Sequence, residues 1–109
     1  MVRNKDIKAL SNQIVTRFDP EQIILFGSYA SGKPGNDSDV DLLVVMRFEG
    51  RRFRQSVEIL NAIRPKFPVD LIVWRPEEVK RRYRLGDPLI GDALDKGRVI
   101  YARSPERVD

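Results

Sequence analysis

Three aspartates have residue types and spacing that suit metal-ion chemistry. Asp39 and Asp41 open the apolar run 40–45, and Asp70 lies about thirty residues later inside the run 69–74. Side chains alternate along a strand, so Asp39 and Asp41 face the same side with their Cα atoms roughly 6–7 Å apart. Carboxylates gathered this closely repel one another unless a cation or protons intervene. If Asp70 lies at the same level on a neighbouring strand, the three predict an oxygen-only site for Mg²⁺ or Mn²⁺.

A glycine–serine turn precedes these aspartates. Gly27 and Ser28 follow the apolar run 23–26, and backbone N–H groups at such a turn, together with the serine hydroxyl, can hold a phosphate. A P-loop is excluded because Pro34 stands where a Ser or Thr must bind Mg²⁺ and where a helix must continue. Taken alone, Ser28 is better read as an ordinary helix N-cap. Taken alone, Asp39 and Asp41 also fit a solvated strand edge or the end of a loop, and Asp70 is better read as an exposed residue of an edge strand. The joint occurrence of all parts favours a functional site.

The composition limits the chemistry that the chain can perform. Its 109 residues include no cysteine and no histidine, which removes thiolate nucleophiles, the serine–histidine triad and the usual general base. Apolar residues make up 41% and charged residues 33%, a balance typical of a globular protein. We expect one domain over residues 1–109 with a fraying polar tail from about residue 103. The start lacks an apolar leader, and no apolar stretch reaches the roughly 20 residues that span a bilayer, so a cytoplasmic protein without membrane contact is expected.

Hydrophobic periodicity predicts the elements that must position the candidate site. A helix over 5–18 has a core face at helical spacing, and a second amphipathic helix over 51–64 has its apolar positions at Phe53, Val57, Leu60 and Ile63. Turn formers at 32–38 predict a loop. Short apolar runs predict strands at 23–26, 40–45, 69–74 and 99–101, and helix-start signals at Pro76 and Asp87–Pro88 predict two further helices, the second ending near Gly97.

Basic residues concentrate in the second part of the chain. Residues 1–46 hold five basic and six acidic side chains, whereas residues 47–109 hold fifteen and ten. The run Lys80–Arg84 is either an electrostatic dock for nucleic acid or an acidic partner, or a solvated helix face. Arg51, Arg52 and Arg54 oppose the dipole of a helix start and need compensation from solvent, acids or a bound anion. Trp74, on the strand face of Asp70, either borders an adenine site or lies in the core.

Three segments together resemble the minimal nucleotidyltransferases of the DNA polymerase β superfamily. They are Leu25-Phe-Gly-Ser-Tyr-Ala-Ser-Gly32, Ser38-Asp-Val-Asp-Leu-Leu-Val44 and Val69-Asp-Leu-Ile-Val73, and a closing helix, glycine and strand over 93–101 match as well. The resemblance implies an α/β (α+β) fold with a small mixed β-sheet flanked by helices. It implies that Gly27 and Ser28 hold the triphosphate of ATP, that Asp39 and Asp41 bind two Mg²⁺ ions, with Mn²⁺ possible, and that Asp70 completes the metal-binding and catalytic triad.

The size of the chain is similar to that of the antitoxin half of toxin–antitoxin pairs whose toxin is a helical HEPN ribonuclease. In that family the enzyme adenylylates a tyrosine of the toxin, which implies AMP transfer from ATP to a partner hydroxyl. Tyr29 and Ser31 stand where many relatives have arginines. The alternative is a non-catalytic antitoxin that neutralises its partner by contact. Direct nucleic-acid binding is not expected, because a recognised motif and an aromatic platform are both missing; a homo-oligomer remains compatible with the sequence.

Overall fold

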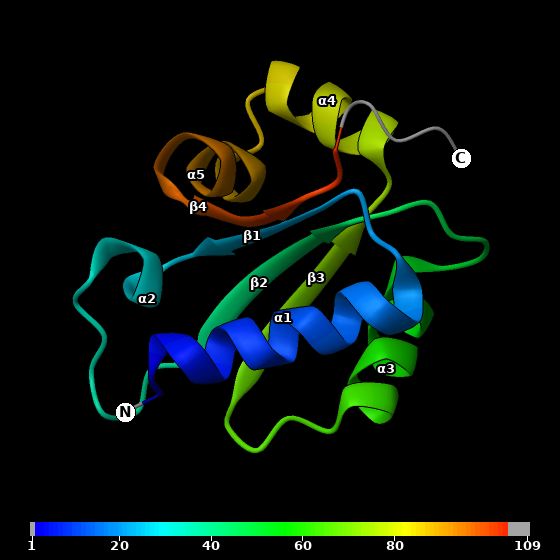
Figure 1. The fold of residues 1–109 in the computed structure, drawn as a ribbon. Helices are drawn as coiled ribbons and strands as arrows, with labels where there is room; N and C mark the ends of the chain where they lie inside the picture. The colour runs from blue at the N-terminus through cyan, green and yellow to red at the C-terminus, as the bar shows by residue number, and fades with distance from the viewer. Residues whose placement is uncertain (1, 105–109) are drawn as a thin grey trace.

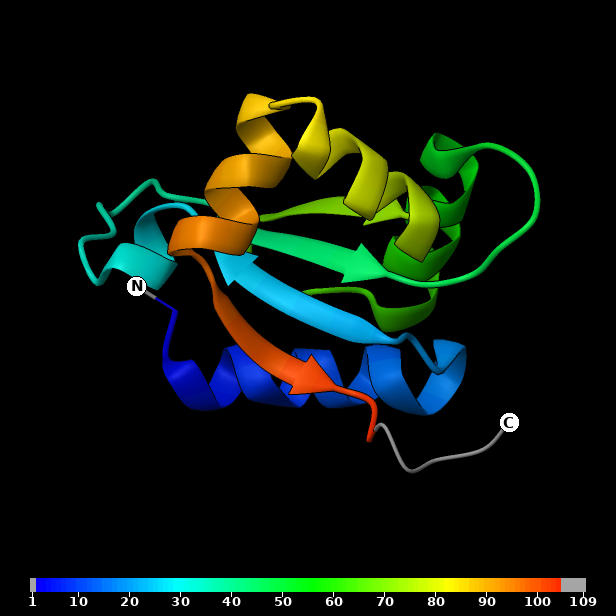
Figure 2. The same ribbon diagram turned by 90° about the horizontal axis from the view of Figure 1, so that it is seen from above.

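A four-stranded mixed sheet forms the centre of the computed structural model, which describes residues 2–104. The strand order is β3-β2-β1-β4, with helices on both faces (Figures 1 and 2). The elements are α1 (Asn4–Phe18), β1 (Gln22–Phe26), α2 (Ser28–Ser31), β2 (Val40–Val45), α3 (Arg52–Ile63), β3 (Val69–Trp74), α4 (Pro76–Arg84), α5 (Pro88–Lys96) and β4 (Arg98–Ala102).

The strand directions bring three chain segments to one end of the sheet. β1 runs antiparallel to both β2 and β4, whereas β2 and β3 are parallel because α3 carries the chain back between them. The end of β1 therefore meets the starts of β2 and β3, and Phe26, Asp41 and Asp70 stand side by side across three strands. This end of the sheet is where the sequence places its candidate site.

Alternating side chains fill a separate core on each face of the sheet. Val40, Leu42 and Val44 point to the face covered by α1 and α3, and Leu43 and Val45 point to the face covered by α4 and α5. In Figure 1 the two helix pairs lie on opposite sides of the strands. Since β2 is buried on both faces, its apolar run tolerates an aspartate only at its end.

The predicted helices and strands are confirmed, but the buried face of α3 matches the predicted one only in part: Ile63 is buried and Leu60 packs against the core, as predicted. The buried residues of α3 are Gln55, Ser56, Ile59 and Ile63, whereas Phe53 is 79% and Val57 37% exposed. The hydroxyl of Ser56 donates to the carbonyl oxygen of Phe53 at 2.7 Å, which satisfies this buried polar group. The helix is thus rotated relative to its apolar periodicity, and two apolar side chains face outward.

The last described residues are held more firmly than the predicted tail. Arg103 donates from its backbone N–H to the carbonyl oxygen of Glu21 at 2.8 Å, and from Nη2 to the carbonyl oxygen of Asp19 at 2.6 Å. The expectation of fraying from about residue 103 is therefore wrong at Arg103, and the remainder of that tail, 105–109, lies outside the described residues. Between residues 2 and 104 the structure contains no helix of the length and apolarity that crossing a bilayer requires.

Candidate functional site

The structure brings the three aspartates to one end of the sheet, as predicted. Asp41 is paired with Asp70 in the parallel register of β2 and β3, so the two lie at the same level on strands about 4.8 Å apart. Asp39 directly precedes β2. Val40 and Leu42, the neighbours of Asp41, are fully buried. Alternation therefore turns Asp41 to the face covered by α4 and α5, the face that Ile72 and Trp74 on β3 share.

The three carboxylates differ in exposure, and the middle one is the most confined. Asp39 and Asp70 are exposed, whereas Asp41 is half-buried. Burial raises the pKa of the Asp41 carboxyl, and the negative charges of Asp70 and then Asp39 raise this pKa further. The fold thus holds a carboxylate where its ionisation is opposed by its surroundings, an arrangement common at functional sites.

Gly27 is fitted to Asp41 more closely than its sequence position suggests. It has φ 72° and ψ −152°, and a Cβ built on it would collide with Oδ2 of Asp41. Only glycine allows both this backbone conformation and this approach. The N-cap of α2 is Gly27 and not Ser28, so the N-cap reading of Ser28 is wrong. Ala30 and Ser31 donate to the Gly27 carbonyl oxygen, which leaves the N–H groups of Ser28 and Tyr29 at the open start of the turn.

The three carboxylates are of a type that binds a hard divalent cation, but their present spacing limits how many of them can bind one ion. As the side chains stand, no three Asp, Glu, His or Cys residues within the part of the chain that the structure describes approach closely enough to hold one ion. Mg²⁺ is usually bound by one or two carboxylates together with substrate phosphates and water. The pair Asp41 and Asp70, with Asp39 two residues away on the same side, matches that ligand set, and a cation would offset the repulsion that raises the pKa of Asp41.

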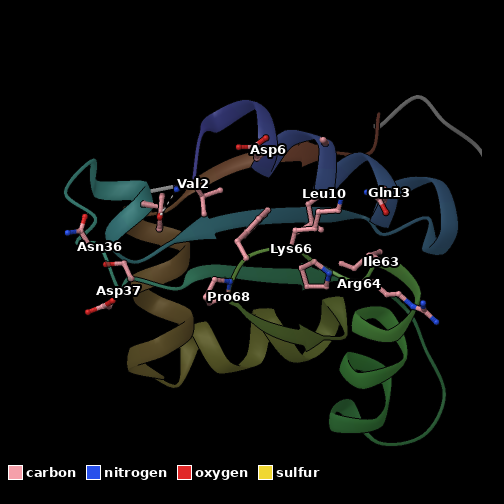
Figure 3. Close-up of a pocket in the computed structure, with 15 residues that line it drawn as sticks. Val2, Asp6, Leu10, Gln13, Asn36, Asp37, Ile63, Arg64, Lys66 and Pro68 are labelled. Atoms are coloured by element: carbon pink, nitrogen blue, oxygen red, sulfur yellow. Dashed lines mark hydrogen bonds between the residues drawn. The ribbon is translucent and has the colours of Figure 1, made fainter.

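A cavity of about 970 Å³ opens on the other face of the sheet, beside α1. Side chains of α1 and of the segment 63–68 line it, with Asn36 and Asp37 at one end (Figure 3). Tyr29 also lines it, is 9% exposed, and accepts a hydrogen bond from the backbone N–H of Val2 at 3.1 Å. Tyr29 therefore packs away from the aspartates. The sequence did not reveal this cavity, because its walls come from three segments far apart in the chain.

Trp74 lies on the strand face of Asp70, as alternation predicts, but its ring is covered. It is 6% exposed and belongs to the core beneath α4 and α5. The guanidinium Cζ of Arg52 stands 3.4 Å from the ring centroid. Of the two readings of Trp74, the core residue is confirmed, and the open wall of an adenine site is wrong.

Comparisons with known proteins found one family and several similar proteins. The family model described as "Nucleotidyltransferase domain" matches residues 7–100. A "putative protein adenylyltransferase" of Methanocaldococcus jannaschii is 27% identical over 103 residues, which cover 93% of this chain and 100% of that protein. All five residues of the candidate site fall within the matched range.

Solved structures share the fold. The crystal structure of a "putative nucleotidyltransferase" from Sulfolobus solfataricus matches with a TM-score of 0.64 and 22% identity, covering 91% of this chain and 79% of that chain. The crystal structure of a toxin–antitoxin with AMP-PNP matches with a TM-score of 0.57 and 20% identity, covering 94% of this chain and 76% of that chain. The expected mixed sheet flanked by helices is confirmed.

Proposed function

The chain belongs to the nucleotidyltransferase domain family, and from that premise we propose that it transfers AMP from ATP to a hydroxyl group of a partner protein. The observation that carries this proposal is the placement of Asp41 opposite Asp70, directly beside the backbone of Gly27. A turn suited to phosphate and a carboxylate pair suited to a cation lie within contact of each other. A phosphoryl-transfer site needs little more than such positioning and electrostatics.

Each candidate residue has a separate task in the proposed reaction. Gly27 and Ser28 hold the triphosphate through backbone N–H groups and the serine hydroxyl. Asp39, Asp41 and Asp70 would hold Mg²⁺, with Mn²⁺ as a substitute, and a cation bound there would stabilise the negative charge of the phosphate oxygens. Asp39 and Asp70 are exposed, so the substrate and the acceptor hydroxyl can reach both from solvent.

The reaction is an in-line displacement at the α-phosphorus of ATP. The acceptor oxygen forms a bond to the α-phosphorus, and the bond from this phosphorus to the pyrophosphate oxygen breaks. Pyrophosphate leaves with the electron pair, and AMP stays on the acceptor. The carboxylate of Asp70 takes the proton of the attacking hydroxyl, a role for which the chain has no histidine to compete.

We propose a tyrosine of a cognate helical HEPN toxin as the acceptor, which gives the chain an antitoxin role. Two similarities support this choice. The Methanocaldococcus jannaschii relative is named "putative protein adenylyltransferase", and a structural neighbour is part of a toxin–antitoxin solved with the ATP analogue AMP-PNP.

Intact-mass analysis tests the proposal. The purified chain is incubated with Mg²⁺, ATP and a co-expressed helical protein encoded beside it, and both proteins are then weighed. We expect an added AMP mass on the partner that is absent with the Asp39→Asn variant. A stable complex with no added mass on the partner would overturn AMP transfer and favour an antitoxin that acts by contact alone.

A further inference from the structure

Helix α3 carries an apolar strip on its exposed side. Phe53 is 79% exposed and Val57, one turn later, is 37% exposed, whereas Gln55 and Ser56 of the same helix are buried. Residues four apart lie on one helix face, so Phe53 and Val57 form a continuous strip. Apolar side chains are usually buried and polar ones exposed, and this part of α3 has the reverse arrangement. The strip is therefore suited to being covered by another molecule.

A cationic cluster surrounds Trp74 at the start of the same helix. The guanidinium Cζ atoms of Arg52 and Arg82 stand 3.4 Å and 4.7 Å from the centroid of the Trp74 ring. Arg82 has an acidic neighbour, since its Nη1 lies 3.6 Å from Oδ2 of Asp87. The ion pairs found between residues 2 and 104 include none to Arg52. Two cations on one ring repel each other, and an anion bound beside them would relieve that repulsion.

Two buried N–H donors of this cluster have no acceptor among the described residues. They are Nε1 of Trp74, a residue that is 94% buried, and Nε of Arg82. A buried donor without a partner is costly, so such groups are normally paired. Both atoms lie beneath the accessible surface, whereas the side chain of Arg82 as a whole is 42% exposed. What the cluster offers to a partner is therefore its positive charge, and a carboxylate supplies the negative charge that Arg52 lacks.

The start of α3 adds further positive potential. Arg51 stands at the N-cap without a side-chain hydrogen bond to the helix, and the first turn contains no acidic residue. Arg51, Arg52 and Arg54 thus add their charges to the positive end of the helix dipole, where an anion is stabilised.

We propose that the strip Phe53–Val57 and the cluster Arg52, Trp74 and Arg82 form a docking surface for an acidic, partly apolar segment of a protein partner. A carboxylate of the partner binds at the cluster, and an adjacent apolar side chain packs on the strip. Nucleic acid would also supply anionic oxygens, and the ring of Phe53 could stack on one base. The strip offers no second ring beside it, and the adjacent aliphatic Val57 suits an apolar side chain, which favours protein.

The surface lies within reach of the candidate active site. Trp74 follows Asp70 by four residues on the same strand face, about 13 Å along β3. A protein docked here can therefore extend to Asp70. That the docked protein is also the AMP acceptor rests on the proposed function; the docking surface itself does not.

Trp74 is the single tryptophan of the chain, so its fluorescence and its indole N–H resonance report on the ring that Arg52 and Arg82 contact. The probe is a short amphipathic peptide of glutamate and leucine, compared with the same peptide carrying glutamine in place of glutamate and with a single-stranded oligouridylate. We expect the glutamate peptide to shift both signals saturably, and the other two to bind more weakly. No shift with the glutamate peptide, or tighter binding of oligouridylate, would overturn the proposal.

Two variants and one matched control separate docking from folding. Arg52→Gln and Phe53→Ser should each weaken peptide binding about tenfold, the loss expected for one charge-assisted contact or one apolar contact. Lys8→Gln removes one exposed positive charge from α1, a helix that contributes no residue to the strip or the cluster, and should bind as the wild type does. Unchanged melting temperatures show that the fold is intact, and equal affinities of all three variants would contradict the assignment.

The same titration distinguishes this inference from the proposed function. The Asp39→Asn variant should bind the peptide normally while failing to transfer AMP. If the wild type transfers AMP to its partner but Arg52→Gln and Phe53→Ser leave both the transfer rate and the partner affinity unchanged, the docking surface is wrong and the enzyme assignment stands.

Discussion

Asp41 lies directly opposite Asp70 across the parallel strands β2 and β3, and burial, followed by the charge of Asp70, raises the pKa of the Asp41 carboxyl. The fold therefore maintains a repulsion that contributes nothing to its own stability. Such an arrangement is consistent with a cation-binding site. Residues placed for binding often lower the stability of the protein when the ligand is absent. Five predictions about this site and its surroundings test the consequence.

Asp41→Asn should make the cation-free protein more stable at neutral pH. The pKa of Asp41 is raised in the folded state above its ordinary value of 3.8. At a pH between 3.8 and the raised pKa, the folded chain therefore binds more protons than the unfolded chain. The free energy of unfolding then falls as pH rises through this window, and the full penalty persists above it. Asn removes the penalty, so urea unfolding should show a stability gain at pH 7 that disappears below the window. A less stable Asp41→Asn at pH 7 would contradict the penalty that burial and the neighbouring carboxylates impose on ionised Asp41.

Asp39→Asn should abolish AMP transfer while leaving the fold intact. Asp39 is exposed and precedes β2, so an isosteric amide changes little packing, but it removes a charged ligand and should slow transfer at least about 100-fold. Asp37→Asn, two residues earlier on the same exposed loop, is the matched control and should retain activity. Radiolabelled AMP transfer measures both, and equal loss in the two variants would point to a general effect of loop charge.

Gly27→Ala should damage the site more than the same change at another left-handed glycine. Gly27 and Gly32 have φ 72° and 80°, so alanine at either position is strained by about 1–3 kcal/mol. A Cβ at Gly27 also collides with Oδ2 of Asp41, whereas one at Gly32 meets nothing within 4 Å. Chemical unfolding should therefore show a larger loss for Gly27→Ala, and only this variant should lose the stabilisation by a nucleotide. Similar losses of stability and of nucleotide binding at both positions would show that Gly27 is needed only for the turn and not for its contact with Asp41.

The Gly27 contact shows what sequence could predict about this protein and what it could not. The alternation of Asp39, Val40 and Asp41 predicted one face for the carboxylates, and short apolar runs predicted the strands. The register that places Asp70 opposite Asp41 was a condition of the prediction that the structure meets. The collision of a Gly27 Cβ with Asp41 depends on how β1 leaves its antiparallel pairing with β2, which no local pattern encodes.

Helix α3 shows a case in which a clear pattern misled in part. Its apolar periodicity selected Phe53, Val57, Leu60 and Ile63. Leu60 and Ile63 do pack on the core, but in the first half of the helix the buried residues are Gln55 and Ser56. Periodicity reports which face is apolar, not which neighbour covers it. The stacking of Arg52 on Trp74 joins α3 to β3, so no pattern within α3 could predict it. An apolar surface for a partner also has the same sequence pattern as a core face, so the sequence could not distinguish the two. The predicted functions of Asp39, Asp41, Asp70, Gly27 and Ser28 stay predictions.

Asp70→Asn should separate catalysis from contact. If Asp70 accepts the proton of the attacking hydroxyl, its amide variant should bind the partner with unchanged affinity, because it lies about 13 Å along β3 from the proposed docking surface, but should transfer no AMP. Co-purification measures the complex, and survival of cells that express the toxin measures protection. Full protection by Asp70→Asn without AMP on the partner would establish neutralisation by contact.

A non-hydrolysable ATP analogue with Mg²⁺ or Mn²⁺ should raise the melting temperature of the wild type more than that of Asp39→Asn/Asp41→Asn. A ligand at 100 times its dissociation constant adds about 2.7 kcal/mol to the free energy of unfolding, which corresponds to roughly 10–20 °C for a chain of this size. The double variant loses two carboxylate ligands and should show a small shift. Because Asp41→Asn is expected to stabilise the cation-free protein, the shifts must be compared and not the melting temperatures themselves. Equal shifts in both proteins, with and without the divalent ion, would remove Asp39 and Asp41 from the binding site.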